Sequence, residues 1–234
     1  SKGKILPVNR FIKSVEDESL KLADSVFAQT VSGGWVDESE VIDYVEEDVI
    51  MTPDLSTIRK IPWNKEPTAQ VICDLYNNAN SPSNIAPRQI LKNIMILLNE
   101  NQMEAVVAPE LEFYLCEQNL DPDLPLKTPI GKSGRREKGS KVFGIDAVNE
   151  FDKIMDDIYD YSEQLGIGVD TLVHESGPAQ IEINLNHGDP LELADQAFMF
   201  KRAVRQVALK HGVHATFMSK PYSEHPGSSM HIHQ

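Results

Sequence analysis

Three short segments alternate apolar residues with acidic, amide or histidine residues, and this pattern constrains the fold more than any other feature. They are PELEF (109–113), QIEINL (180–185) and MHIH (230–233). Because successive side chains of a strand point to opposite faces, each segment predicts a strand with one apolar and one polar face. The residues expected to share a polar face are Glu110 with Glu112, Glu182 with Asn184, and His231 with His233.

Two interpretations of these strands are open. Each strand could be half-exposed and simply turn its polar residues to water. Alternatively, the three could form a curved sheet whose concave face collects carboxylates and imidazoles, and such carboxylates cannot all stay ionised without a cation between them. Carboxylate oxygens with one or two imidazoles suit Mg²⁺ or Mn²⁺, and zinc is less favoured because neither cysteine is placed to help.

Two turn-like segments lie beside these strands. In HESGPAQIEIN (174–184) the Ser-Gly-Pro sequence predicts a turn that could bring Glu175 and Glu182 toward one another. In GSS (227–229) backbone N–H groups could approach a ligand closely. The basic stretch GKSGRREKGSK (131–141) is interpreted as a solvated loop or hairpin tip, with a phosphate-facing or subunit-facing role as the alternative.

The remaining patterns predict a chain of mixed strands and helices. The segment 77–87, rich in Asn, Ser and Pro, indicates a connection and sets an expected domain boundary between residues 83 and 84. Strand-like runs precede it, including VFAQTV (26–31). Helices are expected around residues 90–98 and over 147–165. A third helix should begin at Pro190, capped by Asp189 in an Asp-x-x-Glu capping box with Glu192.

The charge of the chain excludes some classes of partner. The 36 acidic and 22 basic residues give a formal net charge of −14, which argues against nucleic acid and against an anionic membrane surface. No apolar run is long enough to span a bilayer, and the first residues lack the apolar region of a secretory signal. The two cysteines suit free thiols in a reducing compartment, so a cytoplasmic location is expected.

Taken together, the motifs resemble those of the glutamine synthetase family. PELEFYL, HESGPAQIEIN and KPYSEHPGSSMHIHQ (220–234) are similar to three of its signatures and occur in the family's order and at about its separation. The stretches PDLSTIRKIPW (53–63) and GRREKGSKVFGIDAVNEFD (134–152) look like the γ-glutamylpolyamine synthetase branch.

This resemblance implies an α+β fold. Residues 1–83 would form a small N-terminal β-grasp-like domain, expected to lack its first strand. Residues 84–234 would be the first half of a catalytic α/β domain with a curved antiparallel sheet. Members of the family assemble as rings, so a ring-shaped homo-oligomer is implied for the intact protein. Family members are roughly twice this long, so the chain is expected to be a piece with little or no activity by itself.

The resemblance also implies an activity and a set of site residues. The activity would be an ATP-dependent ligation of the glutamate γ-carboxylate to an amine such as a polyamine, through γ-glutamyl phosphate, with Mg²⁺ or Mn²⁺. No residue is assigned as a catalytic acid or base. The implied roles are a first metal ion at Glu112, Glu175 and Glu182, a second at Glu110 and His231, ATP at His233 and Asp170, and glutamate at Gly227.

Three departures from the family pattern favour an amine larger than ammonia. Pro226 replaces the asparagine before the signature glycine, and Ser229 replaces the second glycine. Thr30 stands where ammonia-using relatives have an aspartate. The alternatives are a glutamine synthetase that uses ammonia, a two-metal hydrolase built on the same residues, and a non-catalytic relative.

Overall fold

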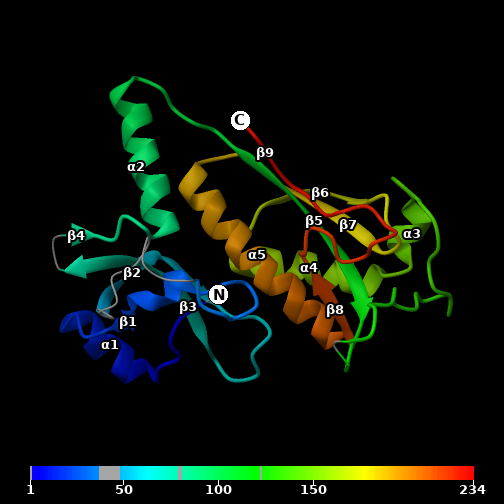
Figure 1. Cartoon of the computed structure of the whole chain (residues 1–234), viewed down its shortest axis with the longest axis horizontal. Coiled ribbons are helices and arrows are strands. Elements are labelled where there is room, and N and C mark those ends of the chain that lie inside the picture. The colour runs from blue at the N-terminus through cyan, green and yellow to red at the C-terminus, as the bar shows by residue number, and fades with distance from the viewer. Residues whose placement is uncertain (1, 37–47, 79–80, 122) are drawn as a thin grey trace. The chain divides into compact units, whose positions relative to one another are not determined.

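The computed structural model describes residues 2–36, 48–78, 81–121 and 123–234. The chain divides into two compact units, each with its own β-sheet (Figure 1). The first unit comprises Ser1–Ile58 and Gln70–Glu104, and the second comprises Arg59–Ala69 and Ala105–Gln234. The domain boundary expected between residues 83 and 84 stays a prediction.

The first unit contains a four-stranded sheet in the order β1-β2-β3-β4. Its strands are β1 (Lys21–Ala23), β2 (Asp48–Lys60), β3 (Ala69–Asn78) and β4 (Ser81–Pro82), and its helices are α1 (Val8–Glu16), η1 (Asp24–Ala28) and α2 (Pro87–Glu100). The strand expected over 26–31 is wrong at its start, because residues 24–28 form the 3₁₀ helix η1. β-Branched residues form a strand when a neighbouring strand can pair with them, and this tertiary condition overrides local propensity.

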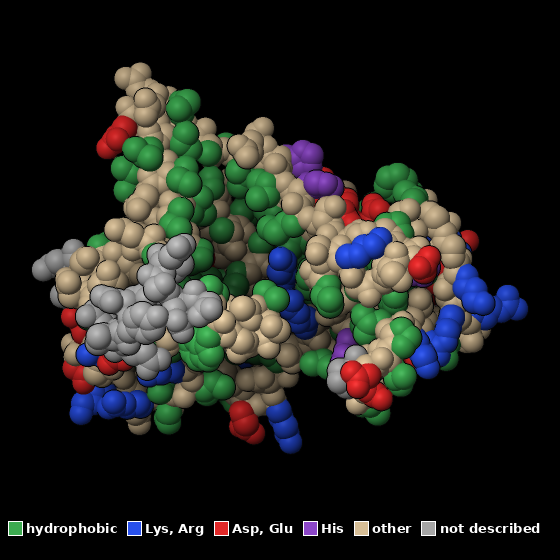
Figure 2. All heavy atoms as spheres, viewed as in Figure 1, with side chains coloured by type: hydrophobic (Ala, Val, Ile, Leu, Met, Phe, Trp, Pro, Cys, Tyr) green, Lys and Arg blue, Asp and Glu red, His purple; other side chains and the backbone are tan. Residues whose placement is uncertain are grey.

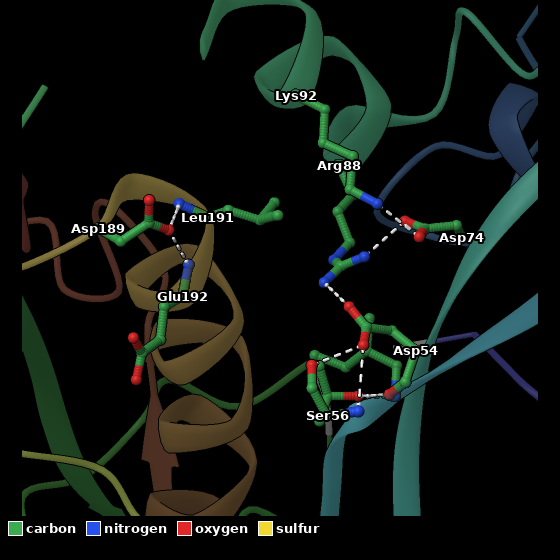
Figure 3. Close-up of polar contacts among 10 residues, drawn as sticks. Asp54, Ser56, Asp74, Arg88, Lys92, Asp189, Leu191 and Glu192 are labelled. Carbon is green, nitrogen blue, oxygen red and sulfur yellow. Dashed lines mark hydrogen bonds and ion pairs between the residues drawn. The ribbon is translucent and has the colours of Figure 1, made fainter. Parts of the chain in front are cut away.

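Helix α2 confirms the apolar periodicity noted around residues 90–98. Arg88 in its first turn donates to Asp54 of β2 at 2.6 Å and to Asp74 of β3 at 2.5 Å (Figure 3). Lys92, one turn further, donates to the other oxygen of Asp74 at 2.5 Å. Two cations on one face of α2 therefore fix this helix to two strands of its own sheet.

The second unit contains a five-stranded antiparallel sheet in which β5 is central. Along one edge β5 pairs with β7, while its other edge is shared by β9 at Ala108–Leu111 and β8 at Tyr114–Glu117. The strands are β5 (Ala108–Glu117), β6 (Val169–His174), β7 (Gln180–Leu185), β8 (Val213–Thr216) and β9 (Met230–His233).

The apolar sides of the alternating strands form the core of this unit. Leu111, Phe113, Ile181 and Ile183 are all completely buried. Helix α5 (Pro190–Lys210) packs against β5, β8 and α4 (Asp152–Leu165). The expected α+β class with an antiparallel sheet is thereby confirmed.

The helices of the second unit differ from the sequence prediction in two respects. The helix expected over 147–165 is interrupted and forms α3 (Ile145–Asn149) and α4, whose C-cap is Gly166 with a φ of 71°. Asp189 caps α5 as predicted, because its Oδ1 accepts from the N–H groups of Leu191 and Glu192 at 2.9 Å each (Figure 3). The reciprocal half of the capping box is wrong, since the Glu192 carboxylate accepts instead from Gln196.

Among the described residues, no helix has both the length and the apolar character that a membrane span requires. Both cysteines, Cys73 and Cys116, are free thiols. Burial raises the pKa of each thiol to about 11, so neither is a reactive thiolate at neutral pH.

Candidate active site

The register of the second sheet places the predicted polar residues on one face. Glu112 of β5 lies directly opposite Glu182 of β7. Glu110 lies opposite Asn184 on that side and opposite His231 of β9 on the other. Directly opposed residues of antiparallel strands share a face, so the common polar face expected from the alternation is confirmed.

Both histidines of β9 converge on one carboxylate. His231 Nδ1 lies 3.2 Å from Glu110 Oε2, and His233 Nε2 lies 2.8 Å from Glu110 Oε1. Both imidazoles are more than half exposed, whereas 22% of the Glu110 side chain is exposed. Figure 2 shows histidine side chains beside acidic ones at the surface near β9. The predicted partner of His231 is therefore found beside it, together with His233.

Glu112 is held by a residue to which the sequence alone gave no role. Its side chain is largely buried, and its Oε2 accepts from Gln180 Nε2 at 3.0 Å. The same amide nitrogen donates to the carbonyl oxygen of Gly227 at 2.9 Å. Gln180, which is completely buried, therefore joins β5, β7 and the loop before β9 at the polar face.

Gly227 lies where a side chain would not fit. A Cβ atom there would lie 2.6 Å from the carbonyl oxygen of Ser219, which also accepts from Ser228 N–H at 2.9 Å. The close approach of two backbone segments therefore explains the glycine. Its predicted role in positioning glutamate stays a prediction.

Glu175 begins the turn that connects β6 to β7, as the Ser-Gly-Pro sequence indicated. Its N–H donates to the carbonyl oxygen of Gln180 at 2.8 Å, and Gly177 N–H donates to the Gln180 side-chain oxygen at 2.8 Å. A Cβ atom on Gly177 would overlap the hydroxyl of Tyr114, so this turn packs directly on β5. The predicted turn is confirmed.

Three neighbouring carboxylates act electrostatically on Glu182. Burial, followed by the charges of Glu110, Glu175 and Glu112, raises the pKa of Glu182 above its ordinary value. Oxygen donors that repel one another in this way, with an adjacent imidazole, form a donor set that suits a hard divalent cation. In the chemistry of their donor atoms, these residues suit Mg²⁺ or Mn²⁺.

The ligand set is nevertheless not closed around a single point. Within the described ranges, no three His, Cys, Asp or Glu side chains are grouped tightly enough to hold a metal ion. The carboxylates instead have other partners: Glu112 is bonded to Gln180, Glu110 faces two imidazoles, and Glu175 accepts from Ser176 N–H at 2.9 Å. The assignment of individual ligands stays a prediction.

Asp170 lies apart from these carboxylates in its electrostatic effect. It is exposed at an irregularity of β6 between Val169 and Thr171. Burial and then the Asp170 charge raise the pKa of Tyr159 on α4, while Asp170 is not among the groups that raise the pKa of Glu182. Its predicted contact with ATP stays a prediction.

A buried acidic residue in the basic stretch 131–141 was missed. Glu137 has 2% of its side chain exposed and bonds to the completely buried His174 at 2.8 Å. The interpretation of the whole stretch as solvated is therefore wrong at this residue. The available signal was weak: Glu137 is the one acidic residue in that basic run, and a chain reversal that brings it to β6 cannot be read from local sequence.

Comparison with known proteins defines the class. The sequence profile described as "Glutamine synthetase, catalytic domain" matches residues 84–234. Since that match covers more than half of the chain, the protein belongs to the glutamine synthetase family.

Two curated relatives and one solved structure illustrate this membership. Gamma-glutamylputrescine synthetase PuuA of Escherichia coli (strain K12) is 35% identical over 235 residues, covering 99% of this chain and 49% of the relative. Glutamate–isopropylamine ligase of a Pseudomonas species is 30% identical over 238 residues, covering 99% of this chain and 50% of the relative. A crystal structure of a glutamine synthase homolog superimposes with a TM-score of 0.82 at 18% identity, covering 99% of this chain and 51% of that chain. This likeness shows the fold. The chain thus spans about half the length of these proteins.

Proposed function

We propose that the intact protein is an ATP-dependent ligase that joins the γ-carboxylate of glutamate to an amine. The observation that carries this proposal is the strand register that gathers Glu110, Glu112, Glu182 and His231 on one polar face. Family membership agrees with it, and the two relatives described above are named for ligations of glutamate with amines.

The proposed roles distribute two divalent cations, Mg²⁺ or Mn²⁺, over the polar face. When bound, the ions would act as Lewis acids and offset charge that builds on the transferred oxygens. In this proposal a first ion is held by Glu112, Glu175 and Glu182, a second by Glu110 and His231, ATP by His233 and Asp170, and the substrate glutamate at Gly227.

The proposed reaction has two steps. The glutamate γ-carboxylate attacks the γ-phosphorus of ATP, which forms γ-glutamyl phosphate and releases ADP. The amine nitrogen then attacks the acyl carbon, phosphate leaves, and the nitrogen loses a proton to solvent. In this scheme Gln180 holds Glu112 and the Gly227 backbone in fixed relation, because one amide nitrogen donates to both.

The acceptor is proposed to be a polyamine or a similar amine, with ammonia as the alternative. The proposal also includes a ring-shaped homo-oligomer, which the family resemblance implies, and a cytoplasmic location, which rests on the two cysteines and the sequence of the first residues. Pro226 and Ser229, which depart from the family pattern, support an acceptor larger than ammonia.

Phosphate release by the intact protein tests this function. We expect release from ATP in the presence of glutamate to depend on one amine among putrescine, isopropylamine, ethanolamine and ammonia. The variant Glu112→Gln should lower the rate at least about 100-fold, because it removes a charged ligand from the proposed metal site.

The matched control is Glu163→Gln on the exposed side of α4, which should retain the full rate. If ammonia alone stimulates phosphate release, the acceptor is ammonia and not a larger amine, and the protein is still an ATP-dependent ligase. Absence of stimulation by any amine, together with no binding of ATP or Mn²⁺, would contradict the ligase and favour the non-catalytic relative.

A further inference from the structure

We propose that Glu137 is a positioning residue for the polar face: with His174 it holds the turn between β6 and β7 that carries Glu175 and Gln180. This inference rests on the proposed function, because the positioned residues are proposed to serve the metal site. Glu137 lies in the stretch 134–152, outside the three signatures that hold most of the proposed site residues, and the proposed function gave it no role.

The contacts of Glu137 converge on both ends of this turn. Its Oε2 accepts from His174 Nε2 at 2.8 Å, at the end of β6, and from Ala179 N–H at 2.6 Å, just before β7. Its Oε1 lies 3.4 Å from Lys141 Nζ. One carboxylate oxygen thus joins the residue before Glu175 to the residue before Gln180.

The His174 ring has a polar contact at each of its two nitrogens. Its Nδ1 lies 2.6 Å from the carbonyl oxygen of Glu175, and its Nε2 faces the Glu137 carboxylate. A carbonyl oxygen can only accept, so Nδ1 donates to Glu175. His174 is completely buried, so these two contacts fix the orientation of its ring.

The turn needs such an anchor because its backbone is strained. Ala179 has a φ of 55°, a left-handed conformation that L-residues other than glycine and asparagine adopt rarely. Its N–H is bonded to Glu137 and its carbonyl accepts from Leu115 N–H at 2.9 Å, so both sides of the strained peptide are held. Without Glu137 the N–H would be buried without an acceptor, and the turn could relax.

A relaxed turn would displace the groups proposed to act on substrate. Gln180 follows Ala179 directly, and its side chain holds Glu112 and Gly227. Glu175 is fixed at the other end, where its carbonyl accepts from His174. Outer residues that orient metal ligands typically change metal affinity by about 10–100-fold when removed.

The test measures Mn²⁺ affinity of the intact protein by isothermal titration calorimetry. We compare the wild type with Glu137→Ala, Glu137→Gln and Asp152→Asn. Glu137→Ala removes the acceptor, whereas Glu137→Gln keeps an oxygen that can accept from Ala179 N–H. Asp152 is the matched control, because it forms an exposed ion pair with Lys132 of the same loop.

We expect Glu137→Ala to weaken Mn²⁺ binding about 10–100-fold while its circular dichroism stays that of the wild type. Glu137→Gln should recover most of the affinity, and Asp152→Asn should bind as the wild type does. Amide hydrogen exchange of residues 175–182 should quicken in Glu137→Ala, which reports the turn independently of metal.

A folded Glu137→Ala variant with Mn²⁺ affinity within twofold of the wild type would overturn the positioning role and leave the ligase intact. If Glu137→Ala does not fold, His174→Gln decides in its place, because it removes the other end of the contact. Unchanged Mn²⁺ affinity and unchanged amide exchange of residues 175–182 in His174→Gln would overturn the role. A wild type that does not bind Mn²⁺ would instead remove the proposed function, and this inference with it.

Discussion

At the scale of single residues, Ala179 shows how the candidate site departs from local backbone preference. Its φ of 55° is in the left-handed region, and the residue is completely buried. Its N–H donates to the Glu137 carboxylate, and its carbonyl oxygen accepts from Leu115 N–H. A left-handed alanine costs about 1–2 kcal/mol, which the surrounding contacts must offset. The strain therefore lies at the turn that presents Glu175 and Gln180.

Replacing this alanine by glycine tests the strain. Ala179→Gly relieves about 1–2 kcal/mol, but loses a buried methyl group and adds freedom to the unfolded chain, each worth about 0.5–1 kcal/mol. We expect the free energy of unfolding to change by less than about 1 kcal/mol, measured by urea denaturation.

The matched control is Ala215→Gly in β8, where alanine has an ordinary strand conformation and is also buried. At Ala215 the substitution also loses a buried methyl group and adds freedom to the unfolded chain, but it relieves no backbone strain. The free energy of unfolding should therefore fall by about 1–2 kcal/mol. Equal destabilisation by both substitutions would show that the Ala179 backbone is not strained.

At the scale of secondary-structure elements, α5 and β5 together position the polar face. Helix α5 covers β5 and β8 with a buried apolar face that includes Phe200 and Val204. Its start is fixed by the Asp189 cap, because that carboxylate satisfies two of the first N–H groups of the helix. A single substitution at Asp189 can therefore remove the cap that fixes the start of α5.

Asp189→Ala should lower the free energy of unfolding by about 1 kcal/mol, the usual value of an N-cap, in urea denaturation. Glu192→Ala is the control in the same turn. Because the Glu192 side chain bonds Gln196 and not the cap, we expect it to cost less than about half as much. A larger cost at Glu192 than at Asp189 would show that the capping box forms in solution.

At the scale of the whole molecule, carboxylates whose pKa is lowered by their hydrogen-bond partners make stability depend on pH in a definite direction. Hydrogen bonds from Ser56 and Arg88 lower the pKa of Asp54 in the first unit. In the second unit, burial opposes but hydrogen bonds from His174 and Ala179 lower the pKa of Glu137. Ordinary values for these groups are 3.8 and 4.5.

When the pKa of a carboxylate is lower in the folded protein than in the unfolded chain, the unfolded chain binds the proton at a higher pH as the pH falls. These groups therefore stabilise the protein fully above about pH 4.5 and lose that contribution as the pH falls through their folded values. We expect the free energy of unfolding of the intact protein to fall by about 2 kcal/mol or more between pH 5 and pH 3 in urea titrations.

A variant that lacks one of these carboxylates tests whether they cause the loss of stability at low pH. Glu137→Gln should lose less stability than the wild type over that range, because one titrating group is gone. Glu182 acts in the opposite sense, since its raised pKa favours folding at low pH and opposes it as the pH rises. A pH-independent free energy of unfolding from pH 5 to pH 3 would contradict the assignment.

Much of the candidate site could be predicted from the sequence because alternation in a strand is a local property. The faces of Glu110, Glu112 and Glu182 follow from period-two side-chain placement, and the turn after Glu175 follows from Ser-Gly-Pro. The Asp189 cap was likewise predictable, because a cap involves residues two and three positions away.

The sequence by itself therefore determined the three alternating strands with their polar faces, the start of α5 and the family. The tertiary structure decided which strands are neighbours, that Gln180 bonds Glu112 across 68 positions, and that Glu137 of a basic loop is buried against His174. These contacts depend on chain reversals and on the approach of distant segments. No local period encodes such an approach, so it is fixed when the apolar faces of β5, β7 and α5 pack together.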